Sequence, residues 1–146
     1  MKISRALRNY MLSDGSFRDA MNGGVIRIYS GDPPGSPNDA VPSGADMLCE
    51  LTVDGGDDGL NFREEASEGT LLKNPDENWR GTVETSGTAR WFRFVRSNDG
   101  GSQSMTALRA QGTVERAGGD MNLSSTSLSS GAIQTIDFFS LGLPEG

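Results

Sequence analysis

The feature that most constrains the fold of this chain is a strict alternation of residue types near position 110. Apolar or small residues alternate with polar ones there: Leu108, Ala110, Gly112 and Val114 against Arg109, Gln111, Thr113 and Glu115. A strand with one face in the core and the other in water requires this period of two. Glycine, serine and asparagine separate other short apolar runs throughout 69–144, so the pattern predicts strand after strand joined by turns.

The same period of two predicts strands over most of the chain. We predict them at 25–29, 47–53, 60–62, 70–72, 88–95, 108–115, 121–128 and 132–143, the last with a bulge near Ile136. Short strands with regularly spaced turns favour an all-β fold. We expect an antiparallel β-sandwich of about eight strands, jelly-roll-like, that forms one domain at 25–146.

The first 24 residues have a different period, which predicts a helical arm at 1–24. Helical spacing places five apolar residues on one face: Ile3, Ala6, Leu7, Tyr10 and Met11. Lys2, Arg5 and Arg8 then lie on or beside the opposite face. Ser16 and Asp19 form a capping-box pattern for a second short helix, which Gly23 and Gly24 would end.

Two further segments carry structural expectations. Prolines 33, 34, 37 and 42 occur in the loop 31–46, where fixed φ angles and missing amide donors exclude a central strand. We expect this loop to be an exposed, semi-rigid arm. Alternation over 47–53 places Cys49, with Met47, Leu51 and Val53, toward the core as a small buried hydrophobic residue.

Composition excludes several classes of function. The formal charge is −7, from 20 acidic and 13 basic residues, which disfavours nucleic acid as a partner. No apolar run is long enough for a signal peptide or a membrane span, so we expect no membrane partner. The chain has one cysteine and no histidine, which removes the usual general base for a serine or cysteine nucleophile. We therefore predict a protein that is not an enzyme and has no cofactor or metal.

Three alternatives were weighed against that prediction. A two-carboxylate glycosidase could draw on Glu64, Glu65, Glu68, Asp76 and Glu77, but no spacing among them selects a pair. The acidic run at 54–59 could offer oxygen ligands to calcium, although a solvated turn explains it better. Trp79 and Trp91 could be stacking platforms for a sugar, as in β-sandwich lectins, or could simply pack in the core.

Four stretches of the sequence resemble small structural proteins of tailed bacteriophages and prophages. They are Lys2–Asn9, Asp19–Pro34, Met121–Leu128 and Ile133–Phe139. The resemblance implies a β-sandwich located in the virion and assembled in the host cytoplasm. It implies most directly a capsid decoration, or cement, protein that binds and stabilises the assembled head, and alternatively a tail or head-fibre component. A third alternative, a carbohydrate-binding module, rests on the two tryptophans.

The resemblance also implies the kind of partner. We expect the major capsid protein or another virion protein, and a homo-oligomer, with a trimer favoured. No catalytic residue can be carried over from the family. We predict that the contact surface combines the basic N-terminal residues with the proline-rich loop: Lys2, Arg5, Arg8, Pro33, Pro34 and Pro37.

Overall fold

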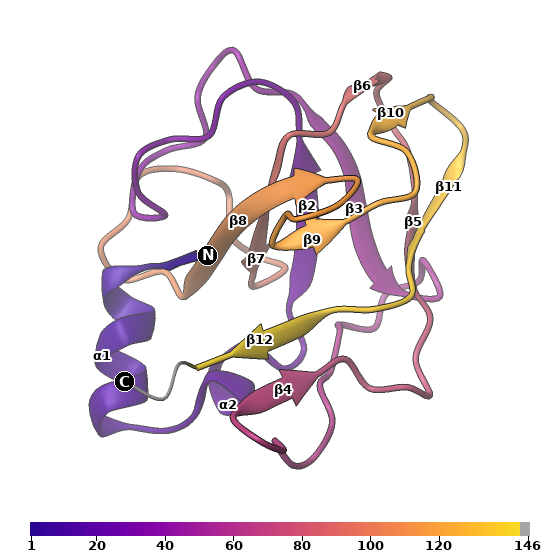
Figure 1. Cartoon of the computed structure of the whole chain (residues 1–146). Coiled ribbons are helices and arrows are strands. Elements are labelled where there is room, and N and C mark those ends of the chain that lie inside the picture. Colours follow the sequence, from indigo (N-terminus) through magenta and orange to yellow (C-terminus); the bar gives the residue numbers. More distant parts are fainter. Residues whose placement is uncertain (144–146) are drawn as a thin grey trace.

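The chain folds into a mostly antiparallel β structure with two short helices near its start (Figure 1). The structure is a computed structural model that describes residues 1–143. Its elements are β1 (Lys2–Ile3), α1 (Arg5–Ser13), α2 (Phe17–Met21), β2 (Val25–Tyr29), β3 (Met47–Val53), β4 (Thr70–Leu72), β5 (Trp79–Thr82), β6 (Gly87–Thr88), β7 (Trp91–Val95), β8 (Arg109–Glu115), β9 (Met121–Asn122), β10 (Ser127–Leu128), β11 (Ile133–Ile136) and β12 (Ser140–Gly142).

One eight-stranded sheet organises the fold. Its order is β1-β8-β7-β2-β3-β5-β11, and β9 pairs in addition with β8 as the one parallel neighbour in the described sheet. Two separate two-stranded ribbons, β4–β12 and β6–β10, complete the strands. The predicted all-β class with a short N-terminal helical segment is confirmed. The jelly-roll arrangement stays a prediction, because this strand order does not establish it.

Most predicted strands are present, and several are divided. β2, β3 and β4 have the predicted bounds, and β8 begins one residue later than predicted. The segment 88–95 contains the end of β6 and all of β7. The segment 121–128 contains β9 and β10, and the segment 132–143 contains β11 and β12. The segment 60–62 forms only isolated bridges, Gly24 to Leu60 and Phe62 to Lys73. β1 and β5 were not predicted, since two and four residues are too few for a period to emerge.

One face of the sheet carries the hydrophobic core. Ile26 and Ile28 of β2 lie opposite Phe94 and Phe92 of β7, and all four are fully buried. Phe62 lies at the centre of an aromatic cluster, with its ring centroid 5.6 to 6.2 Å from those of Phe17, Trp79, Phe94 and Phe139. Such edge and offset contacts add to the free energy gained by burying the rings.

The prediction for Cys49 is confirmed, and its strand has an irregularity. Cys49 and Leu51 are fully buried in the core. The pairing of β3 with β2 shifts at Leu48, because Ile28 lies opposite Cys49 whereas Tyr29 lies opposite Met47. A bulged residue leaves the simple alternation, and Leu48 is accordingly buried in the core as well, on a position predicted to face away from it.

The N-terminal residues differ in one respect from the prediction. Lys2 and Ile3 are not helical but pair with Gln111 and Ala110 of β8. Ser4 then caps α1, because its hydroxyl accepts a hydrogen bond from the amide of Leu7. The predicted capping box of α2, between Ser16 and Asp19, is confirmed. Both helices contribute to the common core, through Leu7, Phe17, Ala20 and Met21.

The other face of the sheet combines buried polar side chains with the stacked rings of Tyr29 and Trp91, and the loop 31–46 covers it. Gln111 Nε2 donates to the carbonyl of Pro34 (3.0 Å), Arg93 Nη2 to that of Asp39 (2.8 Å), and Arg109 Nη1 to that of Pro37 (3.0 Å). The loop is therefore packed on the sheet and is not a free arm, although residues such as Asp32 and Pro33 are exposed as predicted. The acceptors are backbone carbonyls, which every residue has. The residue types in the loop therefore could not predict these contacts.

Candidate docking surface

The residues considered for sugar chemistry serve the fold instead. The indoles of Trp79 and Trp91 are both completely buried, so neither offers a face to a sugar. Glu77 is also engaged, because its carboxylate accepts hydrogen bonds from Trp79 Nε1 (3.0 Å) and from Asn61 Nδ2 (2.9 Å). Glu64, Glu65, Glu68 and Asp76 are exposed. These carboxylates give no reason to propose a glycosidase or a lectin.

The acidic run at 54–59 forms a turn. Asp54 has a positive φ of 56°, and its amide bonds to the carbonyl of Asn78. Asp54, Asp57 and Asp58 are exposed. Within residues 1–143 no group of three or more His, Cys, Asp or Glu side chains could hold a metal ion. The solvated turn is the reading that the geometry supports.

Three of the predicted contact residues lie together. Lys2, Pro33 and Pro34 line a shallow hollow of about 210 Å³ beside β8. Lys2 Nζ donates to the carbonyl of Gly35 (2.9 Å), and the amide of Arg5 bonds to Asn38 Oδ1 (3.0 Å). The N-terminal residues and the proline-rich loop therefore meet in space, as the predicted surface requires.

Pro37 is the exception among the predicted contact residues. It is buried, and the carbonyl that it contributes accepts its hydrogen bond from Arg109, which is itself 2% exposed. Pro37 therefore holds the loop in place and has no surface to offer to a partner.

A buried pair of charges holds two loops, 31–46 and 96–108, above this face of the sheet. Arg109 donates to both carboxylate oxygens of Asp99, from Nε (2.6 Å) and from Nη2 (2.8 Å). Burial alone would raise the pKa of Asp99, but the hydrogen bonds from Arg109 and from the amide of Gly101 outweigh it and hold the pKa below its usual value. The pair is therefore ionised at neutral pH.

Arg93 adds a second buried cation beside Arg109. Burial and the neighbouring Arg109 lower the pKa of Arg93 to about 10, so its guanidinium stays charged at neutral pH. It bonds to Gln111 Oε1 (3.0 Å) and to loop carbonyls, and it lies over the ring of Trp91, 5.5 Å from its centroid. Its Nη1 atom has no hydrogen-bond partner within residues 1–143. The loop above the sheet is thus held by cation-to-carbonyl contacts.

Arg5 and Arg8 lie on the exposed side of α1. Neither side chain forms an ion pair or hydrogen bond within residues 1–143. α1 has no acidic residue in its first turn, where the helix dipole favours acidic side chains and disfavours Arg5. Leu12, one turn further along the same side, is 85% exposed. These three side chains therefore lie in solvent along one side of α1.

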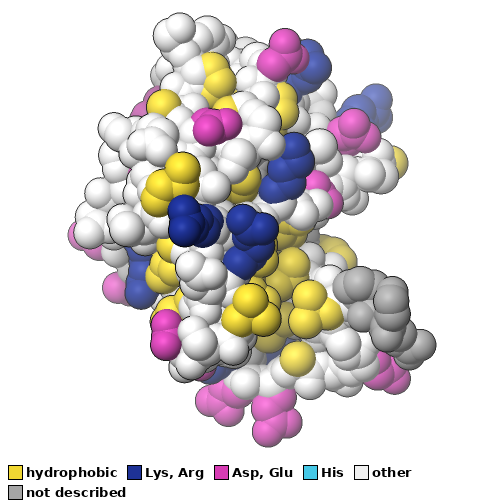
Figure 2. Space-filling model, turned by 90° about the vertical axis from the view of Figure 1, so that its left-hand side faces the viewer, with side chains coloured by type: hydrophobic (Ala, Val, Ile, Leu, Met, Phe, Trp, Pro, Cys, Tyr) yellow, Lys and Arg dark blue, Asp and Glu magenta, His cyan; other side chains and the backbone are white. Residues whose placement is uncertain are grey.

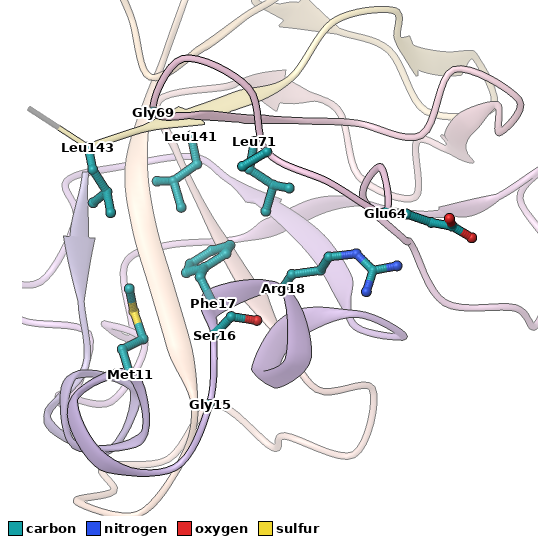
Figure 3. Close-up of a pocket in the computed structure, with 11 residues that line it drawn as sticks. Met11, Gly15, Ser16, Phe17, Arg18, Glu64, Gly69, Leu71, Leu141 and Leu143 are labelled. Atoms are coloured by element: carbon teal, nitrogen blue, oxygen red, sulfur yellow. The ribbon is translucent and has the colours of Figure 1, made fainter.

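An apolar hollow of about 380 Å³ lies next to this side of α1. Figure 3 shows Leu71, Leu141 and Leu143 directed from the β4–β12 side toward Met11 and Phe17 on the helical side. Arg18 and Glu64 lie at one end of the hollow (Figure 3). Leu143 is 65% exposed. We give the name α1 surface to three exposed side chains of α1 and the large apolar residues of this hollow: Arg5, Arg8, Leu12, Met11, Phe17, Leu71, Leu141 and Leu143.

Charge and hydrophobicity combine on the α1 surface. Figure 2 shows this side of the molecule, where basic side chains lie next to a group of apolar ones above a hollowed region. An apolar hollow beside charged side chains is typical of protein interaction sites. The basic residues could be found from the sequence pattern, but the hollow could not. The leucines of the hollow come from β4 and from the end of β12, which are about seventy residues apart in the sequence. Only the pairing of these strands and their packing on the helices brings the leucines together.

Comparisons with known proteins add no further identification. No family model, curated protein or solved structure matches this chain. None of the described helices is long and apolar enough to cross a membrane.

Proposed function

We propose that this chain is a non-enzymatic structural protein of a tailed-phage virion, a decoration protein that binds the assembled head through the α1 surface. The resemblance of four sequence stretches to phage structural proteins supports the setting. The observation that carries the docking role is that Arg5 and Arg8, which have no side-chain partner within residues 1–143, lie beside an apolar hollow on a molecule of net charge −7.

The chemistry of the α1 surface defines the contact on the major capsid protein. Arg5 and Arg8 favour acidic side chains on the partner, and the hollow accepts one or two large apolar side chains. The acidic remainder of the molecule would repel such a partner in other orientations, which selects this one. A modest affinity per copy suffices when a symmetric oligomer, with a trimer favoured, engages several capsid subunits at once.

Charge reversal on α1 tests this proposal. Deletion of the N-terminal residues would be a poor test, because it removes β1 and the buried Leu7 as well. The double variant Arg5→Glu, Arg8→Glu changes exposed side chains alone. We expect its binding to phage heads that lack this protein, measured by co-sedimentation, to weaken by about tenfold or more, which is about 1.4 kcal/mol.

The matched control is Arg116→Glu, an exposed cation beyond the end of β8 that lies away from α1. It should bind heads as the unchanged protein does. Equal binding by the double variant and the unchanged protein would refute the docking role of α1. Absence of the protein from purified infectious particles would refute the virion setting.

A further inference from the structure

The eight-stranded sheet has a free edge at β11. β11 is the last strand in the sheet order and pairs with β5 on its inner side alone within residues 1–143. The amide of Val83 donates to the carbonyl of Ala132 (2.8 Å), which fixes the phase of the hydrogen bonds. Since bonded and non-bonded positions alternate in an antiparallel pair, Ile133 and Thr135 direct their N–H and C=O groups outward.

The residues on this edge do not protect it from pairing. Natural proteins protect a free strand edge with charged residues, proline or a covering loop. Residues 132–136 contain no charge and no proline, and Ile133 is 65% exposed. Phe138, just beyond β11, is 68% exposed. An edge of this kind is suited to accept another strand.

The edge lies along a groove with a definite charge. A groove of about 520 Å³ separates residues 133–140 from residues 119–124, which include β9. Its lining contains two carboxylates, Asp120 and Asp137, and no lysine or arginine. Asp120 is already engaged by the N-terminal amine (3.2 Å). Asp137 is exposed and has no ion-pair or hydrogen-bond partner within residues 1–143.

We propose that this groove binds an extended, lysine- or arginine-bearing segment of a partner protein, which adds to the sheet as a strand beside β11. The outward backbone groups of Ile133 and Thr135 supply the hydrogen bonds, and Asp137 meets a basic side chain. Ile133 and Phe138 contact the apolar side chains of the partner segment, which alternate with its basic side chains.

The position of the groove matters because it is remote from the α1 surface. β11 lies on one side of the molecule and α1 on the other (Figure 1). A protein with a strand-accepting edge on one side and the α1 surface on the other can link two different neighbours. The proposal goes beyond the head-binding role, since it holds for any partner that presents an extended basic segment.

A synthetic peptide tests the groove without any virion component. The probe is a short peptide that alternates valine with lysine and threonine, and its matched control carries glutamate in place of lysine. Each is titrated into the full chain at low salt while backbone amide signals are followed by NMR. We expect the lysine peptide to shift the amides of Ile133 and Thr135 and slow their hydrogen exchange, and the glutamate peptide to bind about tenfold more weakly.

Two variants locate the binding. Ile133→Lys charges the free edge, and Asp137→Asn removes the unpaired carboxylate; both residues are exposed, so the fold should persist. Each should weaken binding of the lysine peptide several-fold, roughly in line with loss of one interface contact. The matched control, Glu64→Gln at the end of the hollow beside α1, should not.

Two results would overturn the proposal. One is that the peptide shifts amides of α1 and leaves those of 133–136 unchanged. The other is that the unliganded protein dimerises through β11, seen as a dimer in sedimentation that Ile133→Lys abolishes, since the occupant would then be a second copy. Failure of head binding by the α1 variant leaves this experiment unaffected, so the two proposals fail separately.

Discussion

At the scale of single residues, the two kinds of ion pair in this protein should differ sharply in their contribution to stability. Arg109 and Asp99 are 2% and 7% exposed, whereas the pair of Arg90 with Asp32 is 57% and 91% exposed. Removal of one partner from a buried pair leaves an uncompensated charge and costs about 3 to 5 kcal/mol. An exposed pair contributes about 0 to 1 kcal/mol.

We therefore expect Asp99→Ala to lower the free energy of unfolding by about 3 kcal/mol or more, and Asp32→Ala to change it by less than about 1 kcal/mol. Urea denaturation of both variants, followed by tryptophan fluorescence, measures the difference. Equal effects would mean that the Asp99 pair does not hold the loops as described. The sequence offered no sign of this pair, because Asp99 lies in a turn whose Asn-Asp-Gly-Gly sequence already explains its presence.

The lowered pKa of Asp99 sets the direction of its pH dependence. An aspartate in an unfolded chain has a pKa of about 3.9. In the folded protein the pKa of Asp99 lies below its usual value. The stabilisation is therefore complete above the unfolded pKa and is lost as the pH falls through the folded pKa. Below about pH 4 the unfolding free energy of the unchanged protein should fall more steeply than that of Asp99→Asn. Parallel pH profiles from denaturation experiments would contradict this.

At the scale of elements, sequence pattern succeeded where one local cause determines a structure. The capping box at Ser16 and the position of β8 depend on a few neighbouring residues and were predicted correctly. The solvent-facing side predicted for β8 is only half exposed, because Arg109 and Gln111 are buried while Thr113 and Glu115 are exposed. The strand β5 was missed, although it is paired on both sides, with β3 and β11, since Gly81 interrupts its four residues. A Cβ atom at Gly81 would lie 1.9 Å from the carbonyl oxygen of Glu50. That glycine permits close approach of β3, a reason that only the tertiary structure reveals.

The loop 31–46 gives the clearest difference between pattern and structure. Prolines correctly excluded a strand there, but Arg109, which the alternation assigned to a wet face, bonds to its carbonyls, and so does Arg93. Replacement of Arg93 by methionine should release the loop while keeping much of the buried volume. We expect amide hydrogen exchange at the non-proline residues 35, 36, 38 and 39 to accelerate by about tenfold or more, with a smaller change in global stability. Arg93→Lys, which keeps a charge but loses the fork of donors, is the comparison variant.

That experiment also has a decisive negative outcome. If exchange of the loop amides is unchanged in Arg93→Met, the carbonyl contacts of Arg93 do not restrain the loop. If every amide in the protein accelerates to the same extent, Arg93 supports the whole fold instead of the loop.

At the scale of the whole molecule, the helices and the sheet share one core. The sequence distinguished a helical arm at 1–24 from a sheet domain at 25–146, because the period changes at Val25. In the structure Leu7 and Phe17 are buried in the same cluster as Phe62 and Phe94. Periodicity reports the type of each element, but which buried faces meet depends on contacts between distant residues. The candidate site shows the same limit, since Arg5 and Arg8 could be found from sequence and the hollow beside them could not.

A shared core has a testable consequence for cooperativity. Leu7→Ala removes a fully buried side chain from α1 and should lower the free energy of unfolding by about 2 to 5 kcal/mol. If α1 and the sheet unfold together, one urea transition will appear in two signals, the helical circular dichroism at about 222 nm and the fluorescence of Trp79 and Trp91. This should hold for the unchanged protein and for Leu7→Ala. An independent arm would lose its helical signal first in Leu7→Ala while the tryptophans remained buried. The exposed Leu12→Ala is the matched control and should leave both transitions where they are, because its side chain is 85% exposed and contributes little to the core.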